Sequence, residues 1–457
     1  MFKINLLSDK YILSLIILGV LSLFPNINVY EFRGEESLRV IVSYEMVKSG
    51  NFLQPTFLGD LYFNKPPLFN WFIAISSFLI PWSELTARIV TIIFLSLTLL
   101  LIYRFSYKIF SDKITALFSS LIYLTFTDIL FWYGYLAEID VTLAFFIFLM
   151  IYFQYFGFIE NRKDYILLSG VVAGLSFLLK GFPALVFFGI TYFALIIFTR
   201  RFKEFLNPFL YISAGISILI PALWILNTAD PERYIQKLFL ESIVRTRGGS
   251  DILKFLTHLV EYPLLNIKQL IPGVIFAFIV IFLHFRKKLS IVLPENIKLL
   301  LFIVALNYIP YILAVESRGR YVIPLFPVLA VVFGYILVKA QKEKLLRAFV
   351  YTALFFITVR FLLGFIGFPI LMEKKASRKK VAYDIIQEVD ISKNIACDCS
   401  PEKSVCLYID FEKGEPLKKS KYMKNWDYLI DCSGNKKGNL LKVYDLKGKK
   451  IYLYEKR

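Results

Sequence analysis

Long apolar runs separated by short polar stretches dominate the 457-residue sequence. Many of these runs are about 18–22 residues long, enough for a helix to cross roughly 30 Å of hydrocarbon. Inside a bilayer only helices and closed barrels satisfy their backbone hydrogen bonds. The pattern therefore predicts a mainly α-helical protein that crosses the membrane many times.

We expect about eleven spans, because basic clusters then end alternate spans on one face, as the positive-inside rule requires. The first run lacks a small-x-small cleavage site, so we interpret it as a span and not as a signal peptide. The predicted spans cover about 11–24, 88–103, 114–132, 139–157, 165–180, 183–199, 209–227, 264–285, 297–315, 321–338 and 348–370.

Two larger polar segments interrupt the membrane part, residues 1–372. The first outer loop covers 28–87 and contains an apolar stretch at 68–81, which is too short for a full crossing and predicts a surface helix. The second outer loop covers 228–262. These outer-face loops and their helices are where we expect polar chemistry.

The composition changes to a Lys-rich, mixed sequence at residues 373–457. A helical spacing at 379–389 and short apolar runs at 404–410, 428–431, 441–444 and 451–454 predict one helix and four strands. We therefore expect a small extramembrane α/β domain. It contains all four cysteines of the chain, which we expect to pair as two disulfides, with a metal site as the alternative. The four are Cys397, Cys399, Cys406 and Cys432.

The formal charge of +18 could indicate a nucleic-acid partner. Many of the basic residues lie in short loops between spans or in the tail, however, and the chain is 57% hydrophobic. Control of topology and attraction to anionic lipid or phosphate explain such a distribution. We expect membrane lipids as partners and no nucleic acid.

The predicted topology gathers many charged side chains on the outer face. Charges at a membrane boundary are costly unless they are paired or functional, so a one-sided collection indicates a site, although each could singly be a snorkelling or orienting charge. The members are Glu35, Glu36, Lys65, Asp140, Lys180, Arg245, Arg247, His258, Arg318 and Arg320.

The first outer loop has the elements of an acid–base site. A carboxylate such as Glu35 can act as general base, and adjacent side chains on a helix diverge by about 100°, so Glu36 would face another direction. Lys65 precedes two prolines that restrict its backbone, which suits a fixed contact to a phosphate near the headgroups.

Several motifs resemble one enzyme family, the GT-C-fold glycosyltransferases that use polyprenyl-phosphate sugars. These include bacterial lipid A aminoarabinose transferases and protein O-mannosyltransferases. The motifs are GEESLR (34–39), EMVKSGNFLQP (45–55), YFNKPPLFNW (62–71), SELTAR (83–88), GYLAEID (134–140), LKGFP (179–183) and RYVIP (320–324).

The resemblance implies roles for individual residues. Glu35 matches the family's catalytic aspartate, Glu36 its acidic neighbour and Asp140 a second acid. Lys65 matches a lysine that contacts the lipid-linked phosphate, and Arg245 resembles a phosphate-binding arginine. Further candidates for phosphate contact are Arg247, Lys180 and Arg320.

Aminoarabinose transferases bind a metal through a glutamate before Lys-Pro-Pro and a later histidine. This chain has Asn64 at the first position, a weak ligand, and His258 in the second loop. We expect no cofactor to be required, with a divalent metal as the alternative.

The resemblance implies an inverting glycosyltransferase of the bacterial inner membrane, with its active site and C-terminal domain on the periplasmic face. The donor would be a polyprenyl-phosphate-linked sugar, and the acceptor lipid A, another surface glycan or a protein. A transporter for lipid-linked sugars and a non-catalytic scaffold are the alternatives. A transporter would place charges midway through spans and show internal repeats, and neither is clear in the sequence.

Overall fold

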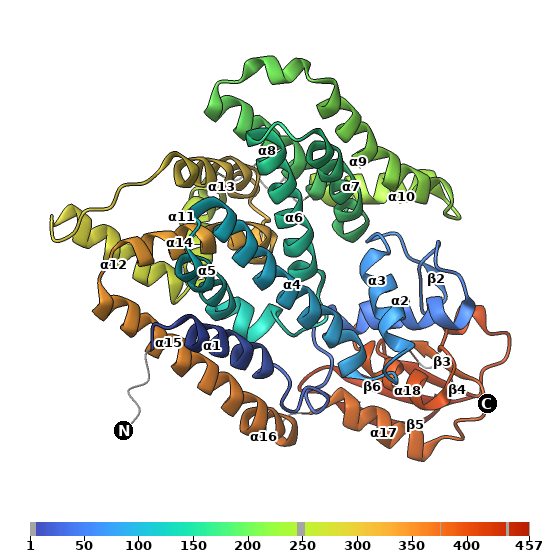
Figure 1. Cartoon of the computed structure of the whole chain (residues 1–457). Helices are drawn as coiled ribbons and strands as arrows, with labels where there is room; N and C mark the ends of the chain where they lie inside the picture. Colours follow the sequence, from blue (N-terminus) through green and yellow to red (C-terminus); the bar gives the residue numbers. More distant parts are fainter. Residues whose placement is uncertain (1–5, 245–251, 375, 436–437, 457) are drawn as a thin grey trace.

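The computed structural model describes residues 6–244, 252–374, 376–435 and 438–456. It consists of a helical bundle and a small C-terminal domain that packs beside the first loop (Figure 1). The predicted combination of a mainly helical membrane part with a small C-terminal α/β domain is confirmed.

The bundle helices follow the predicted apolar runs closely, because those runs carry recognisable helix boundaries. Ser83 and Thr86 form a reciprocal capping box at the start of α4, and the Asp112 side chain caps α5. The bundle helices are α1 (Asp9–Leu21), α4 (Glu84–Phe110), α5 (Lys113–Thr125), α6 (Ile139–Ile159), α7 (Lys163–Lys180), α8 (Pro183–Thr199), α9 (Pro208–Leu226), α12 (Gly273–Phe285), α13 (Glu295–Leu313), α14 (Phe326–Lys339) and α15 (Glu343–Leu362).

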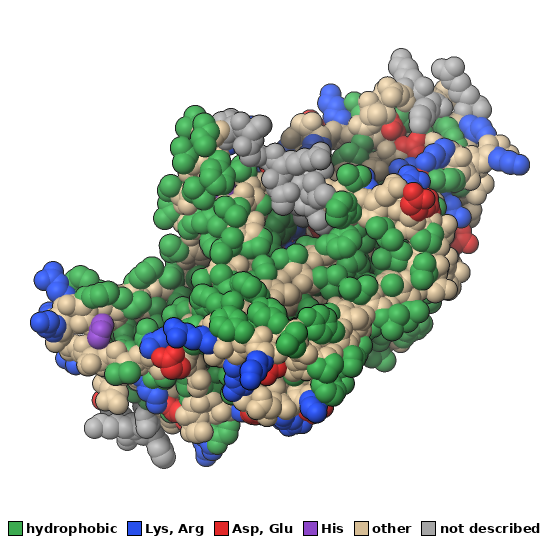
Figure 2. Space-filling view, turned by 90° about the horizontal axis from the view of Figure 1, so that it is seen from above, with side chains coloured by type: hydrophobic (Ala, Val, Ile, Leu, Met, Phe, Trp, Pro, Cys, Tyr) green, Lys and Arg blue, Asp and Glu red, His purple; other side chains and the backbone are tan. Residues whose placement is uncertain are grey.

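Within the described residues, six helices are long and apolar enough to cross a membrane, or seven if one sharply bent pair counts as a span. Several other predicted spans fall in shorter helices, so the number eleven stays a prediction. The exterior fits a lipid environment: Leu223, Phe282 and Phe355 are each more than half exposed. Figure 2 shows apolar side chains across the centre of one face, with charged ones toward its margins.

The bent pair corrects one predicted span. The run predicted at 264–285 is divided between α11 (Ile252–Gln269) and α12, which meet at 103°. Pro272, which has no N–H to donate, lies between the two helices as the N-cap of α12. In its described residues, the second outer loop contains α10 (Pro231–Val244) and most of α11.

The first loop folds into short elements next to the bundle. Glu36–Ser49 forms α2, and Gly50 ends it at φ 71°, a left-handed conformation that favours glycine. A two-stranded hairpin follows, and the predicted surface helix is present as α3. These elements are β1 (Thr56–Phe57), β2 (Asp60–Leu61) and α3 (Leu68–Ser77).

The C-terminal domain follows α16 (Phe368–Lys374) and has a four-stranded sheet in the order β3-β4-β6-β5. Strand β3 pairs in parallel with β4, and the other two pairings are antiparallel. The strand predicted at 404–410 is wrong, since these residues form a helix. The elements are α17 (Arg378–Glu388), β3 (Ile395–Asp398), α18 (Ser404–Lys413), β4 (Tyr428–Asp431), β5 (Asn439–Asp445) and β6 (Lys450–Glu455).

The four cysteines form the two expected disulfides. Cys397 pairs with Cys406 and Cys399 with Cys432. The first bridge joins β3 to α18, and the second joins the residue after β3 to the residue after β4. They therefore fasten the sheet to the helix that faces the first loop.

The C-terminal domain is bonded directly to the first loop. The Tyr408 hydroxyl donates to Glu84 and accepts from the backbone N–H of Phe32. Glu31 is fully buried and accepts from the Ser377 hydroxyl and the Arg378 backbone N–H. Buried charge-assisted bonds of this kind fix the loop against the domain.

Candidate active site

The adjacent glutamates of the first loop have different surroundings. Glu36 is fully buried and forms a two-point ion pair with Arg88, at 2.8 Å for each Nε–Oε1 and Nη2–Oε2 contact. It also accepts from the backbone N–H groups of Arg33 and Ala137. The contacts with Arg88 and Ala137 hold the loop to the bundle, and the contact with Arg33 lies within the loop. We therefore assign Glu36 a structural part and remove it from the candidate bases.

Glu35 is the more accessible of the two. It lies at the N-cap of α2, its side chain is 42% exposed, and its Oε2 is 3.7 Å from Nη2 of Arg39. Lys403, at the start of α18, lies close enough to interact electrostatically with it; burial lowers the pKa of this lysine and Glu35 opposes that shift. Glu35 is thus a carboxylate between two cationic groups, one of them from the C-terminal domain.

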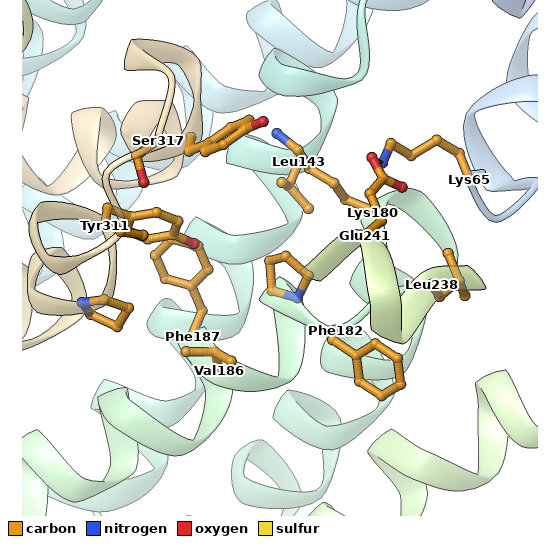
Figure 3. Close-up of a pocket in the computed structure, with 14 residues that line it drawn as sticks. Lys65, Leu143, Lys180, Phe182, Val186, Phe187, Leu238, Glu241, Tyr311 and Ser317 are labelled. Atoms are coloured by element: carbon orange, nitrogen blue, oxygen red, sulfur yellow. Dashed lines mark hydrogen bonds and ion pairs between the residues drawn. The ribbon is translucent and has the colours of Figure 1, made fainter. Parts of the chain in front are cut away.

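Lys65 follows β2 and points toward α10. Its Nζ is 2.5 Å from Oε1 of Glu241 (Figure 3), and its backbone carbonyl accepts from the Tyr234 hydroxyl. The following Pro66–Pro67 restricts the backbone at the start of α3. The lysine is therefore held where the first and second loops meet.

Asp140 and Lys180 form a second pair at the ends of α6 and α7. Asp140 lies in the first turn of α6 and Lys180 ends α7, with Nζ and Oδ1 2.5 Å apart. Arg320 adds a second cation, since its Nη1 is 2.9 Å from Oε2 of Glu138 and 3.9 Å from Oδ2 of Asp140. The result is one continuous row: Lys180, Asp140, Arg320 and Glu138.

Glu138 was not among the predicted site residues, although it lies in the motif at 134–140. Its side chain is only 8% exposed. Burial, together with the neighbouring Asp140 carboxylate, raises the pKa of Glu138 to about 7. Gly34 passes close by: a Cβ there would lie 3.2 Å from Oε1 of Glu138, so Glu138 is near the backbone that carries Glu35.

A cavity of about 250 Å³ ends on these charged pairs. Lys65, Glu241 and Lys180 lie at its polar end, and Figure 3 shows apolar side chains around the rest. Pockets of this kind, apolar with a few convergent polar groups, are the usual form of ligand sites. The apolar lining includes Phe182, Pro183, Val186, Phe187, Leu238 and Tyr311.

The remaining predicted site residues are not gathered at this row. Arg245 and Arg247 lie outside the described residues. His258 is on α11, where its Nε2 is 3.2 Å from the Tyr311 carbonyl and its ring stacks on Tyr262. Asn64 is exposed. Among the described residues, no group of three or more His, Cys, Asp or Glu side chains is placed to hold a metal ion.

The structure has the fold of a known class of membrane enzymes. It matches the crystal structure of ArnT from Cupriavidus metallidurans bound to undecaprenyl phosphate, with a TM-score of 0.73, 14% identity and 98% of each chain covered. The apo structure of the same protein matches with a TM-score of 0.72. The predicted GT-C fold is thereby confirmed.

Sequence comparisons agree with this fold. Residues 64–226 match the family described as dolichyl-phosphate-mannose-protein mannosyltransferase. The undecaprenyl phosphate-alpha-4-amino-4-deoxy-L-arabinose arabinosyl transferase 1 of Pseudomonas fluorescens is 26% identical over 249 residues, which cover 52% of this chain and 44% of that protein. The corresponding transferase of Aeromonas salmonicida is 27% identical over 335 residues, covering 69% and 57%.

The chain is therefore a GT-C-fold protein that resembles the aminoarabinose transferases. It spans less than half the length of the Pseudomonas fluorescens relative. The resemblance stated from the first-loop motifs is confirmed.

Proposed function

We propose that the protein is an integral-membrane glycosyltransferase that moves a sugar from polyprenyl phosphate to an acceptor outside the cytoplasm. One observation carries this proposal: an apolar cavity in the helical bundle ends on two lysines, Lys65 and Lys180, beside carboxylates. An apolar cavity suits a polyprenyl chain, and lysines suit its phosphate.

The reaction requires a base, a nucleophile and a stabilised leaving group. Glu35 takes the proton of an acceptor hydroxyl, and that oxygen attacks the anomeric carbon of the sugar. The bond between this carbon and the phosphate oxygen breaks, and polyprenyl phosphate leaves with the electron pair. Attack from the opposite side inverts the anomeric centre, while Lys65 and Lys180 stabilise the charge on the phosphate.

The other charged residues position these groups. Asp140 orients Lys180 and Arg320, and Arg39 holds the Glu35 carboxylate through an ion pair. We propose that no metal is required, because Asn64 is a weak ligand and His258 Nε2 lies 3.2 Å from the Tyr311 carbonyl. The acceptor we favour is lipid A or another surface glycan, at the periplasmic face of a bacterial inner membrane.

Mass spectrometry of lipid A, surface glycans and envelope proteins tests this proposal. A strain lacking the protein is complemented with wild type, Glu35→Gln or the control Glu232→Gln, which alters an exposed glutamate on α10. Membrane levels of each variant are compared by immunoblotting. We expect one sugar to be missing from the deletion strain and restored by wild type and Glu232→Gln but not by Glu35→Gln.

Other outcomes would contradict the proposal in separate ways. Restoration by Glu35→Gln would exclude Glu35 as the base and favour a transporter of lipid-linked sugars or a scaffold. An unchanged set of glycans in the deletion strain would contradict the transferase activity itself.

A further inference from the structure

A groove of about 620 Å³ lies in the bundle between α1, α4 and α5. Helix α5 packs against both α1 and α4, and residues of all three helices line the groove. Its volume falls in the range of ligand sites, roughly 300–1,000 Å³. As far as the described residues form it, the lining contains none of the proposed site residues, so the groove is separate from the reaction centre.

The charged residues of the groove gather at one end. Asp9 and Lys10 are the first two residues of α1, and Lys113 is the first residue of α5. All three are exposed. Helix α1 leads into the first loop at its other end, and α4 begins where that loop ends. The charged end of the groove therefore lies on the opposite side of the bundle from Glu35.

Apolar side chains continue the groove from its charged end toward the interior of the membrane. Leu13, Ile17 and Leu21 follow one face of α1 at a spacing of four residues, and each is about half exposed. Leu100 of α4 is exposed to the same degree. From Lys10 to Leu21 the helix rises about 16 Å at 1.5 Å per residue. One leaflet of a hydrocarbon core is about 15 Å thick, so this wall matches the length of one acyl chain.

The three charges suit a zwitterionic lipid headgroup. Lysines bind phosphate, and the N-terminal ends of α1 and α5, which both lie here, favour negative charge. A purely anionic headgroup would be repelled by Asp9. A primary ammonium, in contrast, donates hydrogen bonds to a carboxylate. A phosphate that carries a primary ammonium thus satisfies Lys10, Lys113 and Asp9 together.

We infer that the groove binds a membrane phospholipid with a phosphoethanolamine headgroup. Its phosphate contacts Lys10 and Lys113, its ammonium contacts Asp9, and one acyl chain lies along α1. The bound lipid fills the space between α1 and α4, the two helices that the first loop connects. The inference goes beyond the proposed function and does not depend on it.

Native mass spectrometry of the purified full-length protein tests the headgroup contacts. The protein is titrated with phosphatidylethanolamine, with phosphatidylcholine, whose ammonium is quaternary, and with phosphatidylglycerol, which has no ammonium. We expect wild type to bind phosphatidylethanolamine about fivefold more tightly than either of the others, because only its ammonium donates to Asp9. Asp9→Asn should abolish the preference over phosphatidylglycerol.

The two lysines are tested in the same titration. Lys10→Gln combined with Lys113→Gln should weaken binding of phosphatidylethanolamine about tenfold, since hydrogen bonds between charged groups are lost. Lys344→Gln is the matched control: Lys344 is an exposed cation in the first turn of α15 and does not line the groove. Its affinity for the lipid should equal that of wild type.

A second pair of variants tests the apolar wall. Leu100→Trp enlarges a side chain that lines the groove and should weaken binding of phosphatidylethanolamine about fivefold by excluding the acyl chain. Ile93→Trp is its control, because Ile93 is a half-exposed residue of α4 outside the groove. All replaced residues are exposed, and unfolding midpoints in detergent verify that each variant is folded.

Several outcomes would overturn the inference. Equal affinity of wild type for the three phospholipids, or a preference for phosphatidylglycerol, would contradict the headgroup assignment. Unchanged binding by the lysine double variant or by Leu100→Trp would place the lipid elsewhere on the protein, as would equal losses in the two controls. Displacement of phosphatidylethanolamine by polyprenyl phosphate at equimolar concentration would assign the groove to the carrier lipid instead.

Discussion

Glu35 and Glu36 are chemically identical neighbours, and their surroundings give them different parts. Glu36 lies at 0% exposure against Arg88, also at 0%, whereas Glu35 is open to solvent. A buried, two-point ion pair is strongly destabilised when one partner is removed, because the other charge stays buried. The difference in burial predicts that replacing Glu36 destabilises the fold more than replacing Glu35.

Replacement of Glu36 by Ala is expected to lower the free energy of unfolding by about 3–5 kcal/mol, because Arg88 keeps a buried charge without its partner. The loss is measured as a lower midpoint of thermal unfolding in detergent. Glu35→Ala serves as the control and should leave the midpoint nearly unchanged. Equal midpoints for Glu36→Ala and wild type would contradict the structural part assigned to Glu36.

Glu138 makes stability depend on pH. Its pKa is raised to about 7 by burial and Asp140, whereas a free glutamate titrates near 4.3. Between these values the folded protein holds a proton that the unfolded chain has lost, so the stabilising contribution falls as pH rises through this window. We expect wild type to lose thermal stability relative to Glu138→Gln between pH 5 and pH 8. A constant difference between the two would contradict this assignment.

At the scale of elements, the site is built where helix ends and loops meet. Lys65 comes from the first loop, Glu241 from α10 and Lys180 from the end of α7. The site therefore depends on two separate polar segments being held together. The Ala229 backbone N–H, which donates to Oε1 of Gln54, is one of the contacts that does so.

Replacement of Lys65 by Gln is expected to raise KM for the polyprenyl-phosphate donor about tenfold or more, since a hydrogen bond to a charged group contributes about 1.5–3 kcal/mol. KM for the acceptor should change little. Steady-state transfer kinetics with each substrate varied in turn measure both values. Lys108→Gln is the control, because Lys108 pairs with Glu160 at the far end of α4. A change confined to acceptor KM would contradict the donor contact.

The sequence predicted helix positions well where the apolar runs were continuous, as for α8 and α9. The prediction of secondary structure failed where a segment is buried on several sides, because its apolar residues then show no helical or strand periodicity. Residues 404–410 are entirely buried and form a helix, and a short apolar run of this kind does not distinguish a strand from a buried helix. In α11, polar and apolar residues alternate at helical spacing, which we interpreted as a polar loop.

The candidate site shows the same limit. Glu35, Lys65, Asp140, Lys180 and Arg320 could be proposed from the motifs alone. The ion pairs between distant segments could not be predicted. No feature of the neighbouring sequence specifies that Lys65 pairs with Glu241 or that Arg320 pairs with Glu138. Tertiary packing decides such contacts, and it also decides which of two adjacent glutamates is buried.

At the scale of the whole molecule, the C-terminal domain is part of the site's support. Lys403 interacts with Glu35, and Lys419 and Lys421 both pair with Asp60 of β2. These ion pairs keep the pKa of Asp60 well below its usual range. The domain thus contacts the first loop at several points around the proposed base.

The two disulfides should differ in their contribution to stability. The Cys399–Cys432 bridge closes a separation of 33 residues and the Cys397–Cys406 bridge one of 9. Loop-closure entropy then gives about 4 and about 3 kcal/mol respectively. We expect Cys399→Ser with Cys432→Ser to lower the unfolding midpoint more than Cys397→Ser with Cys406→Ser. Equal or reversed losses would contradict this ranking.

The contacts of Tyr408 with Phe32 and Glu84 join segments that lie 376 and 324 residues apart in the chain. A ribosome makes the chain from its N-terminus, so the first loop is inserted long before its partner helix exists. Until residue 408 has been synthesised and has reached the same side of the membrane, the loop lacks part of its support. Assembly order thus keeps the proposed reaction centre incomplete in nascent chains.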